Sequence, residues 1–244
     1  MSNLNKQYNQ EAFRNLDFTK LKLALGGGMA VQDVVAERWE KLTNSPLLEA
    51  YGLSETSPAA TINPINGTHR RGSIGLPLPN TEIKLFDDDG KEVALGQPGE
   101  IGIKGPQVMK GYWNRPDETA KCMLGDYFLT GDIGVMDETG FFKIVDRKKE
   151  MILVSGFNVY PNEVEKAISE NPKVLEVGVR GEKNPDGTEF VKAFVVKKDP
   201  SLTENEVIDE SRKLLTGYKV PREVVFRDEL PKSNVGKILR RLLN

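Results

Sequence analysis

Five consecutive charged residues, Asp146 to Glu150, separate two apolar runs. The first run ends at Val145 and the second begins at Met151. A segment of this charge cannot enter a hydrophobic core, so the chain must cross solvent there. The sequence therefore predicts a junction between two packed bodies, residues 1-147 and residues 148-244.

Residues 1-71 have an α/β pattern, in which an alternating apolar run, the turn Gly26–Gly28 and an apolar pattern of helical spacing follow one another. The turn is not a Walker A loop, because no Gly-Lys-Ser/Thr follows, and G-x-G-x-x-G fails at Val31. From the residues alone, a structural turn and a nucleotide contact at Gly27 and Gly28 are equally well supported.

Residues 72-147 show short alternating runs separated by glycine and proline, a pattern typical of antiparallel β structure. Asp87–Gly90 has the composition of a calcium loop, but Gly96 stands where the closing glutamate is required, so a hairpin turn is expected. Asp137–Gly140 predicts a second hairpin turn. The first body should therefore combine an α/β piece with a β-barrel-like piece, and residues 1-15 should form a helical connector.

The second body predicts a small α+β domain of ordinary size. Pro161 suits the first turn of one helix, and Thr203 with Glu206 forms a capping box for another, which Gly217 would stop and which would carry Leu214 among its apolar residues. Strands are expected over residues 174-179, 190-196 and 224-226.

Composition excludes several classes of protein. A net charge of -2 and a pI of about 5.7 argue against nonspecific binding to nucleic acid. One cysteine, Cys122, and one histidine, His69, cannot form an internal disulfide or a Cys/His zinc site. No apolar run approaches the roughly 20 residues of a spanning helix, and the polar start lacks a signal-peptide core. A cytoplasmic protein is expected, with any chemistry resting on lysine, arginine and carboxylates.

Two segments offer candidate side chains. Tyr51 to Pro58 carries a ring, a hydroxyl and a carboxylate, although from these residues alone a loop tyrosine and a solvated glutamate are the better explanation. Asp132 follows a glycine at the end of an apolar run, where its carboxylate could accept hydrogen bonds from a ribose diol. Trp113 is given only a packing role.

A third candidate is Lys237, on a turn of residues with poor helix propensity. We expect Ile238, Leu239 and Leu242 to anchor a short helix directly after it. Without further information, an exposed lysine in a basic tail is only a solvated charge.

The order of three motifs resembles the carboxyl-terminal half of the adenylate-forming acyl-CoA synthetases, with the closest likeness to bacterial long-chain fatty-acid:CoA ligases. The motifs are TGD at Thr130–Asp132, the segment Val145–Glu165 and the segment Pro231–Arg241. Several long motifs in the right order are more specific than one short motif. The resemblance implies that the chain is a carboxyl-terminal fragment, inactive alone, whose phosphate loop and acyl tunnel would precede Met1.

The resemblance also implies a role for each candidate. Lys237 and Glu55 would be catalytic, with Glu55 holding magnesium, and Lys149 would be the hinge of a mobile small domain. The nucleotide would be bound by Gly27, Gly28, Tyr51, Gly52, Ser54, Asp132, Ile144 and Arg147. A turn of Ser155, Gly156 and Phe157 would line the tunnel for coenzyme A.

The implied reaction is activation of a fatty acid by ATP and Mg²⁺, followed by transfer to coenzyme A. Leu153 and Asn158 favour fatty over aromatic acids. Two alternatives stay open: another adenylating enzyme, such as an aryl-CoA ligase, a luciferase-like oxidase or a peptide-synthetase adenylation domain, and a noncatalytic nucleotide-binding module. A lipid substrate is compatible with peripheral contact at the inner face of the membrane, and no oligomeric state is predicted.

Overall fold

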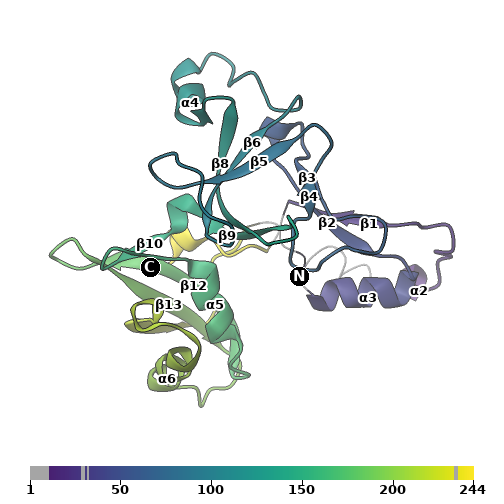
Figure 1. Cartoon of the computed structure of the whole chain (residues 1–244). Helices are drawn as coiled ribbons and strands as arrows, with labels where there is room; N and C mark the ends of the chain where they lie inside the picture. The colour runs from purple at the N-terminus through teal and green to yellow at the C-terminus, as the bar shows by residue number, and fades with distance from the viewer. Residues whose placement is uncertain (1–10, 29–30, 32, 234–235) are drawn as a thin grey trace. The chain divides into compact units, whose positions relative to one another are not determined.

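The computed structural model describes residues 11–28, 31, 33–233 and 236–244. The chain divides into two units, Met1–Ile144 and Val145–Asn244. Figure 1 colours the first from purple to teal-green and the second from green to yellow. The boundary predicted after residue 147 stays a prediction, and most of the helical connector expected over residues 1-15 lies outside the described residues.

After the short helix α2, the first unit contains the predicted strand, glycine turn and helix. Strand β1 runs parallel to β2, and the sheet order is β1-β2-β3-β4. Helix α3 buries Val35 and Ala36 and follows the turn after β1. The elements are α2 (Glu11–Arg14), β1 (Ala24–Gly26), α3 (Asp33–Thr43), β2 (Leu47–Tyr51), η1 (Ser54–Thr56), β3 (Thr61–Ile62) and β4 (Leu76–Pro77).

The rest of this unit is a curled, half-barrel sheet of five strands, as the glycine-punctuated pattern predicted. Strands β5–β6, β6–β8 and β7–β8 are antiparallel, and β9 pairs with β8. Both expected turns form, with Asp87 and Asp137 each accepting backbone hydrogen bonds. The elements are β5 (Glu82–Phe86), β6 (Gly99–Lys104), α4 (Pro116–Lys121), β7 (Met123–Leu124), β8 (Tyr127–Met136) and β9 (Phe142–Arg147).

The core of the curled sheet does not include Trp113. It consists of Ala60, Leu85, Ile101, Ile103 and Phe142. Trp113 is 89% exposed, so the packing role expected for it is wrong. It lies in the loop before α4, where no apolar neighbour covers its ring.

The second unit contains the three predicted strands and two predicted helices. Strand β12 is antiparallel to β13, and β13 is parallel to β14. The elements are η2 (Lys148–Glu150), β10 (Ile152–Val154), β11 (Phe157–Val159), α5 (Pro161–Ser169), β12 (Val174–Lys183), β13 (Glu189–Lys197), α6 (Glu204–Leu214), η3 (Gly217–Lys219), β14 (Glu223–Arg227) and η4 (Arg240–Leu242).

Helix α6 begins as expected, because the Thr203 side chain accepts a hydrogen bond from the Glu206 amide. It ends differently. The last helical residue is Leu214, and Gly217 opens η3 instead of stopping α6. Leu214 lies on α6 as expected and is 54% exposed.

The sheet of the second unit is covered on both faces. Odd-numbered residues of β13, such as Val191 and Val195, join the core formed with α5 and α6. Even-numbered Phe194 packs on the other face with Leu230 and Leu243. The alternation of side chains along a strand requires two such layers when both faces are apolar.

Of the three anchors expected in the C-terminal segment, Leu239 is half-buried, and Leu243 is buried in place of Leu242. Leu243 is 2% exposed, whereas Leu242 is 51% exposed. The short helix turns as η4, a 3-10 helix, so the side chain that meets the sheet shifts by one position. Ile238 packs against the same cluster, in agreement with the prediction.

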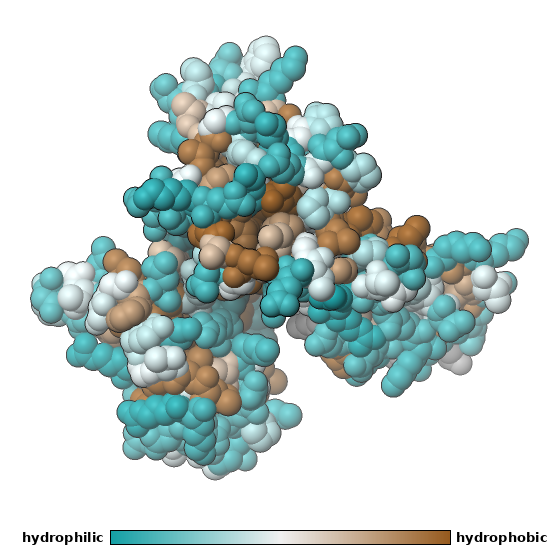
Figure 2. All heavy atoms as spheres, viewed as in Figure 1, coloured by the Kyte–Doolittle hydropathy of each residue, from teal (hydrophilic) through white to brown (hydrophobic). Residues whose placement is uncertain are grey.

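Hydrophilic residues cover much of the face seen in Figure 2, and hydrophobic residues lie between them in patches. Among the residues that the structure describes, no helix combines the length and the apolar character needed to cross a membrane.

Candidate functional site

Two predicted nucleotide-binding residues contact each other in the first unit. The Tyr51 hydroxyl donates a hydrogen bond of 2.7 Å to Asp132 Oδ2, although the residues are 81 positions apart. Tyr51 and Ile144 both pack against the core of the curled sheet. The fold thus brings three of the expected residues into one region.

The TGD motif forms a bulge that aims Asp132. Glu100 pairs with Ile133 and Gly102 pairs with Leu129, so Thr130–Asp132 stand opposite a single residue of β6. Such a bulge redirects side chains. Gly131 adopts a φ of 72°, which glycine accepts without strain, and its amide donates to Glu100 Oε1 at 3.0 Å. Asp132 is 4% exposed.

The loop after Tyr51 is built around close backbone contacts. A Cβ at Gly52 would lie 1.7 Å from the Pro58 carbonyl oxygen, so only glycine fits. Thr56 is fully buried, donates to that same oxygen at 2.8 Å and accepts from the Leu53 amide at 2.9 Å. Ser54 stands exposed at the start of η1. The predicted binding loop therefore has a rigid base and an exposed hydroxyl.

Glu55 contacts a tyrosine that the sequence interpretation missed. The Tyr112 hydroxyl donates to Glu55 Oε1 at 2.8 Å. This hydrogen bond to the carboxylate, followed by burial, raises the pKa of Tyr112 to about 12. Nothing in the sequence near Tyr112 indicated a partner for Glu55.

The oxygens around Glu55 suit a magnesium ion held together with a nucleotide. Mg²⁺ is commonly bound by one or two carboxylates together with substrate phosphates. One Glu55 oxygen accepts the tyrosine hydrogen bond, and the carboxylate has a second. Within the described ranges no three acidic, histidine or cysteine side chains gather into a metal centre. Glu55 therefore fits as a single ligand to an ion that arrives with phosphate.

The two glycines after β1 differ. A Cβ at Gly27 would lie 3.2 Å from the carbonyl oxygen of Ala50 in the neighbouring strand β2, whereas a Cβ at Gly28 would meet open space. Gly28 has a φ of 78°. Gly27 is thus required by the close approach of β2 and Gly28 by its positive φ. Both requirements are compatible with a ligand contact.

In the second unit, Lys237 is exposed on a tight loop, as the sequence predicted. Its carbonyl accepts from the Ser233 amide at 2.8 Å, and its amide donates to Ser233 Oγ at 3.2 Å. Lys232 and Ile238 form a β-bridge across the base of the loop. Hydrogen bonds thus join the described residues at the two ends of the loop, and Lys237 is exposed.

Lys149 and Lys237 line one cleft of about 470 Å³ within this unit. Lys149 lies in η2 and is exposed, and Arg147 is exposed at the end of β9. The structure thus places the expected hinge residue and the expected catalytic lysine on the same opening.

Ser155, Gly156 and Phe157 form the tip of the β10–β11 hairpin. Ser155 has a φ of 51° and Gly156 a φ of 83°, the pattern of a type I′ turn. Phe157 is 56% exposed and stacks on Tyr218, with ring centroids 4.7 Å apart. All three residues are exposed, as a turn that contacts a ligand requires.

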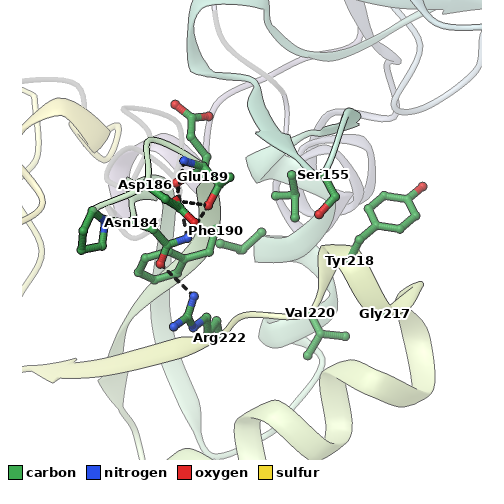
Figure 3. A pocket seen from close by; sticks show the side chains of 13 residues that line it. Ser155, Asn184, Asp186, Glu189, Phe190, Gly217, Tyr218, Val220 and Arg222 are labelled. Atoms are coloured by element: carbon green, nitrogen blue, oxygen red, sulfur yellow. Dashed lines mark hydrogen bonds between the residues drawn. The ribbon is translucent and has the colours of Figure 1, made fainter.

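A cavity of about 630 Å³ adjoins this turn. Figure 3 shows Ser155 and Tyr218 on one side of it and Asn184 and Arg222 on the other. Arg222 donates to Asn184 Oδ1 at 2.8 Å, and its guanidinium lies 4.9 Å from the centre of the Phe190 ring. The cavity combines aromatic and polar walls.

Comparison with known proteins agrees with the geometry. The AMP-binding enzyme family matches residues 1–113, and the AMP-binding enzyme C-terminal domain matches residues 163–237. Proteins named long-chain-fatty-acid–CoA ligase from Escherichia coli O6:H1 and Bacillus subtilis are 59% and 46% identical over 98% and 94% of this chain. The chain spans 43% and 41% of the length of these two relatives.

Solved structures show the same fold. ATP-bound MatB from Rhodopseudomonas palustris has a TM-score of 0.82 at 35% identity, over 90% of this chain and 44% of that one. The o-succinylbenzoate CoA synthetase MenE from Bacillus subtilis, in complex with its acyl-adenylate intermediate, has a TM-score of 0.77 at 32% identity, over 89% and 45%. Both family models match, and the chain is 59% identical to the Escherichia coli O6:H1 protein over 98% of its length. The chain therefore belongs to the AMP-binding, adenylate-forming enzymes.

Proposed function

We propose that this chain is part of a long-chain fatty-acid:CoA ligase. The enzyme converts a fatty acid and ATP to acyl-AMP and pyrophosphate and then transfers the acyl group to coenzyme A. The observation that carries the proposal is the 59% identity, over 98% of the chain, to proteins of that name. The finer description of the chain is proposed with it: residues 1-147 as part of a large domain and residues 148-244 as a small mobile domain.

In the first half-reaction, residues of the first unit would bind the nucleotide. Asp132 would accept hydrogen bonds from the ribose hydroxyls, a role supported by its bond from the Tyr51 hydroxyl. Tyr51 and Ile144 would contact adenine, with Gly27, Gly28 and Gly52 leaving room for it. Ser54 would donate to the α-phosphate.

A magnesium ion held at Glu55 would neutralise charge on the phosphates. Arg147 would bind the ribose. The magnesium ion and the Arg147 guanidinium would both bring positive charge to an anionic nucleotide. This agrees with a chain whose expected chemistry depends on lysine, arginine and carboxylates.

Lys237 would act in the transition state of adenylation. The attacking carboxylate and the α-phosphate are both anions, and negative charge gathers on the phosphoryl oxygens. An ammonium group that is present only at that step lowers the barrier without holding the product. Exposure of Lys237, whose amide donates to Ser233 Oγ, supports this role.

For the second half-reaction the lysine must leave and a thiol must enter. Rotation about Lys149 would exchange the Lys237 loop for the turn of Ser155, Gly156 and Phe157. Gly156 has no side chain to block pantetheine, and the 630 Å³ cavity beside the turn supports a large ligand at this place. Thiol attack on the acyl-AMP carbonyl then forms the thioester and releases AMP.

The substrate class is tested with this chain joined to the upstream part of its 59%-identical relative. Pyrophosphate exchange into ATP should depend on palmitate and not on benzoate or an amino acid. Exchange driven by benzoate or by an amino acid would favour another adenylating enzyme. No exchange with any acid, together with retained ATP binding, would favour a nucleotide-binding module.

Flotation with vesicles tests the proposed contact with the inner membrane face, and fractionation tests the cytoplasmic location.

The role of Lys237 is tested in the same joined enzyme. A lysine charge at about 4 Å in an effective dielectric near 20 contributes about 4 kcal/mol, so Lys237→Ala should slow adenylation about a thousandfold. Transfer from presynthesised acyl-AMP to coenzyme A should persist. Lys213→Ala, an exposed lysine of α6, is the matched control and should change neither rate.

A further inference from the structure

Arg240 lies at the centre of an ionic cluster in the second unit. Its Nη1 donates to Asp146 Oδ1 at 3.0 Å and also to Glu150. Its Nε and Nη2 donate to the two carboxylate oxygens of Glu165 at 2.8 and 2.6 Å, and Nη2 also reaches Asn162 Oδ1. One guanidinium thus joins the junction segment, helix α5 and the C-terminal segment.

The cluster is largely withdrawn from water. The Arg240 side chain is 11% exposed, the Asp146 side chain 1% and the Glu165 side chain 18%. Burial raises the pKa of Glu165, and the bonds from Arg240 offset this only in part. Burial alone would lower the pKa of Arg240, but hydrogen bonding to Glu165 and the surrounding carboxylates hold it above its ordinary value. A cluster of buried charges is costly unless every charge has its partner. Removing one partner therefore leaves the remaining charges buried without compensation.

The positions of the partners matter more than the burial. Asp146 and Glu150 stand on either side of Arg147–Lys149, the segment of the proposed hinge. Asp146 Oδ2 also accepts from the Asn162 amide at 2.7 Å, which fixes it to the start of α5. Arg240 follows Lys237 by three residues. The same side chain therefore holds the junction and one end of the lysine loop.

The opposite end of the loop has its own attachment. Lys232 forms an ion pair with Glu176 of β12, and the Leu239 amide donates to the Pro231 carbonyl at 2.8 Å. Leu243 packs into the sheet beyond Arg240. With Arg240 in place, the loop is fixed at both ends, and Lys237 extends from it.

We infer that Arg240 is a positioning residue, which fixes the Lys237 loop to the junction segment and to α5. The catalytic consequence rests on the proposed function, because the role of Lys237 is part of it. The mechanical consequence does not.

Hydrogen exchange of the 244-residue chain tests the mechanical part. In Arg240→Met, amides of residues 232–233, 236–239 and 146–150 should exchange about tenfold faster, while those of β12 and β13 keep their rates, as expected for local opening. Arg240→Lys should fall between, and Arg241→Met, an exposed neighbour, should match the parent chain. Unchanged exchange in the loop, or equal acceleration throughout the unit, would overturn the inference.

The catalytic part is tested in the joined enzyme described above. Arg240→Met should lower kcat for adenylation about a hundredfold with KM for ATP unchanged, since the lysine is misplaced and the nucleotide site is intact. Arg240→Lys should restore part of kcat. Normal kcat in a variant whose loop exchanges fast would refute the positioning role. If Lys237→Ala itself has no effect, the proposed function fails at that residue, and the exchange result still decides the mechanical inference.

Discussion

The two units hold their candidate functional groups in opposite ways. In the first, Asp132 is buried in a bulge and hydrogen-bonded to Tyr51. In the second, Lys237 and Phe157 are exposed. Of the groups that support the loop, Leu243 is buried and the Arg240 side chain is 11% exposed.

This difference suits the proposed reaction, which has two steps. A group that contacts the nucleotide throughout can be built into a core, where neighbours fix its orientation. A group needed for one step must be free to leave, so it is best carried at the end of a rigid support. The comparison therefore predicts that stability and function separate in the second unit and coincide in the first.

The largest expected effect on stability comes from the buried support of the second unit. Leu243→Ala should lower the free energy of unfolding of that unit by about 2 to 5 kcal/mol, through lost burial and a cavity beside Phe194. Leu242→Ala removes a side chain that is 51% exposed and should cost under about 0.5 kcal/mol. Urea unfolding followed by hydrogen exchange of each unit measures both. Equal costs would remove the distinction between buried support and exposed tip.

In the first unit, Gly52→Ala should destabilise by about 3 kcal/mol, because the new methyl group would lie 1.7 Å from the Pro58 carbonyl oxygen. Gly67→Ala is the control. Gly67 has a φ of 87° but open space around it, so strain alone should cost about 1 kcal/mol. The same unfolding assay applies, and the loss of nucleotide binding should follow Gly52→Ala alone.

A smaller effect should follow removal of the Tyr51 hydroxyl. Tyr51→Phe leaves the buried Asp132 carboxylate without that donor, which should cost about 2 kcal/mol of stability in the first unit and weaken nucleotide binding as well. Tyr127→Phe removes a similar bond to the exposed Glu82 and should cost under about 0.5 kcal/mol. If Tyr51→Phe changed binding with no loss of stability, the coincidence proposed for this unit would be wrong.

The smallest effect concerns protonation of Tyr112, which donates a hydrogen bond to Glu55. The pKa of Tyr112 is raised to about 12, so this tyrosine adds stability that is complete below about pH 10 and is lost as the pH rises through 12. In Glu55→Gln the pKa should move back toward 10, because the carboxylate that opposes the phenolate is gone. Carbon-13 NMR of labelled tyrosine measures the shift, and Glu82→Gln, beside Tyr127, is the control that should leave Tyr112 unchanged.

Much of the fold could be predicted because its signals are local. Glycine turns, the Thr203 cap and the alternating runs depend on neighbours in sequence, and the structure has strands and helices at those places. The Leu242 anchor and the packing of Trp113 were wrong because each depends on which side of a short turn faces a distant surface. Periodicity over so few residues does not decide that.

The contacts within the candidate site were harder to predict from the sequence. Asp132 and Lys237 could be singled out by motif, but the bond between Tyr51 and Asp132 depends on the register of a bulge 81 residues downstream. Arg240 stood in a basic tail, and nothing near it in sequence pointed to carboxylates at positions 146, 150 and 165. Long-range pairing of charges leaves no local pattern, so only the assembled sheet could show it.

The double-sided sheet of the second unit has a consequence for biosynthesis. One face is covered by helix α5, which precedes the strands in the chain, and by helix α6, which lies between β13 and β14. The face around Phe194 is completed only by Leu243. On the ribosome, the nascent domain must expose that apolar face until residue 243 has emerged. Chaperone binding to the growing chain should therefore persist until that point and stop abruptly after it.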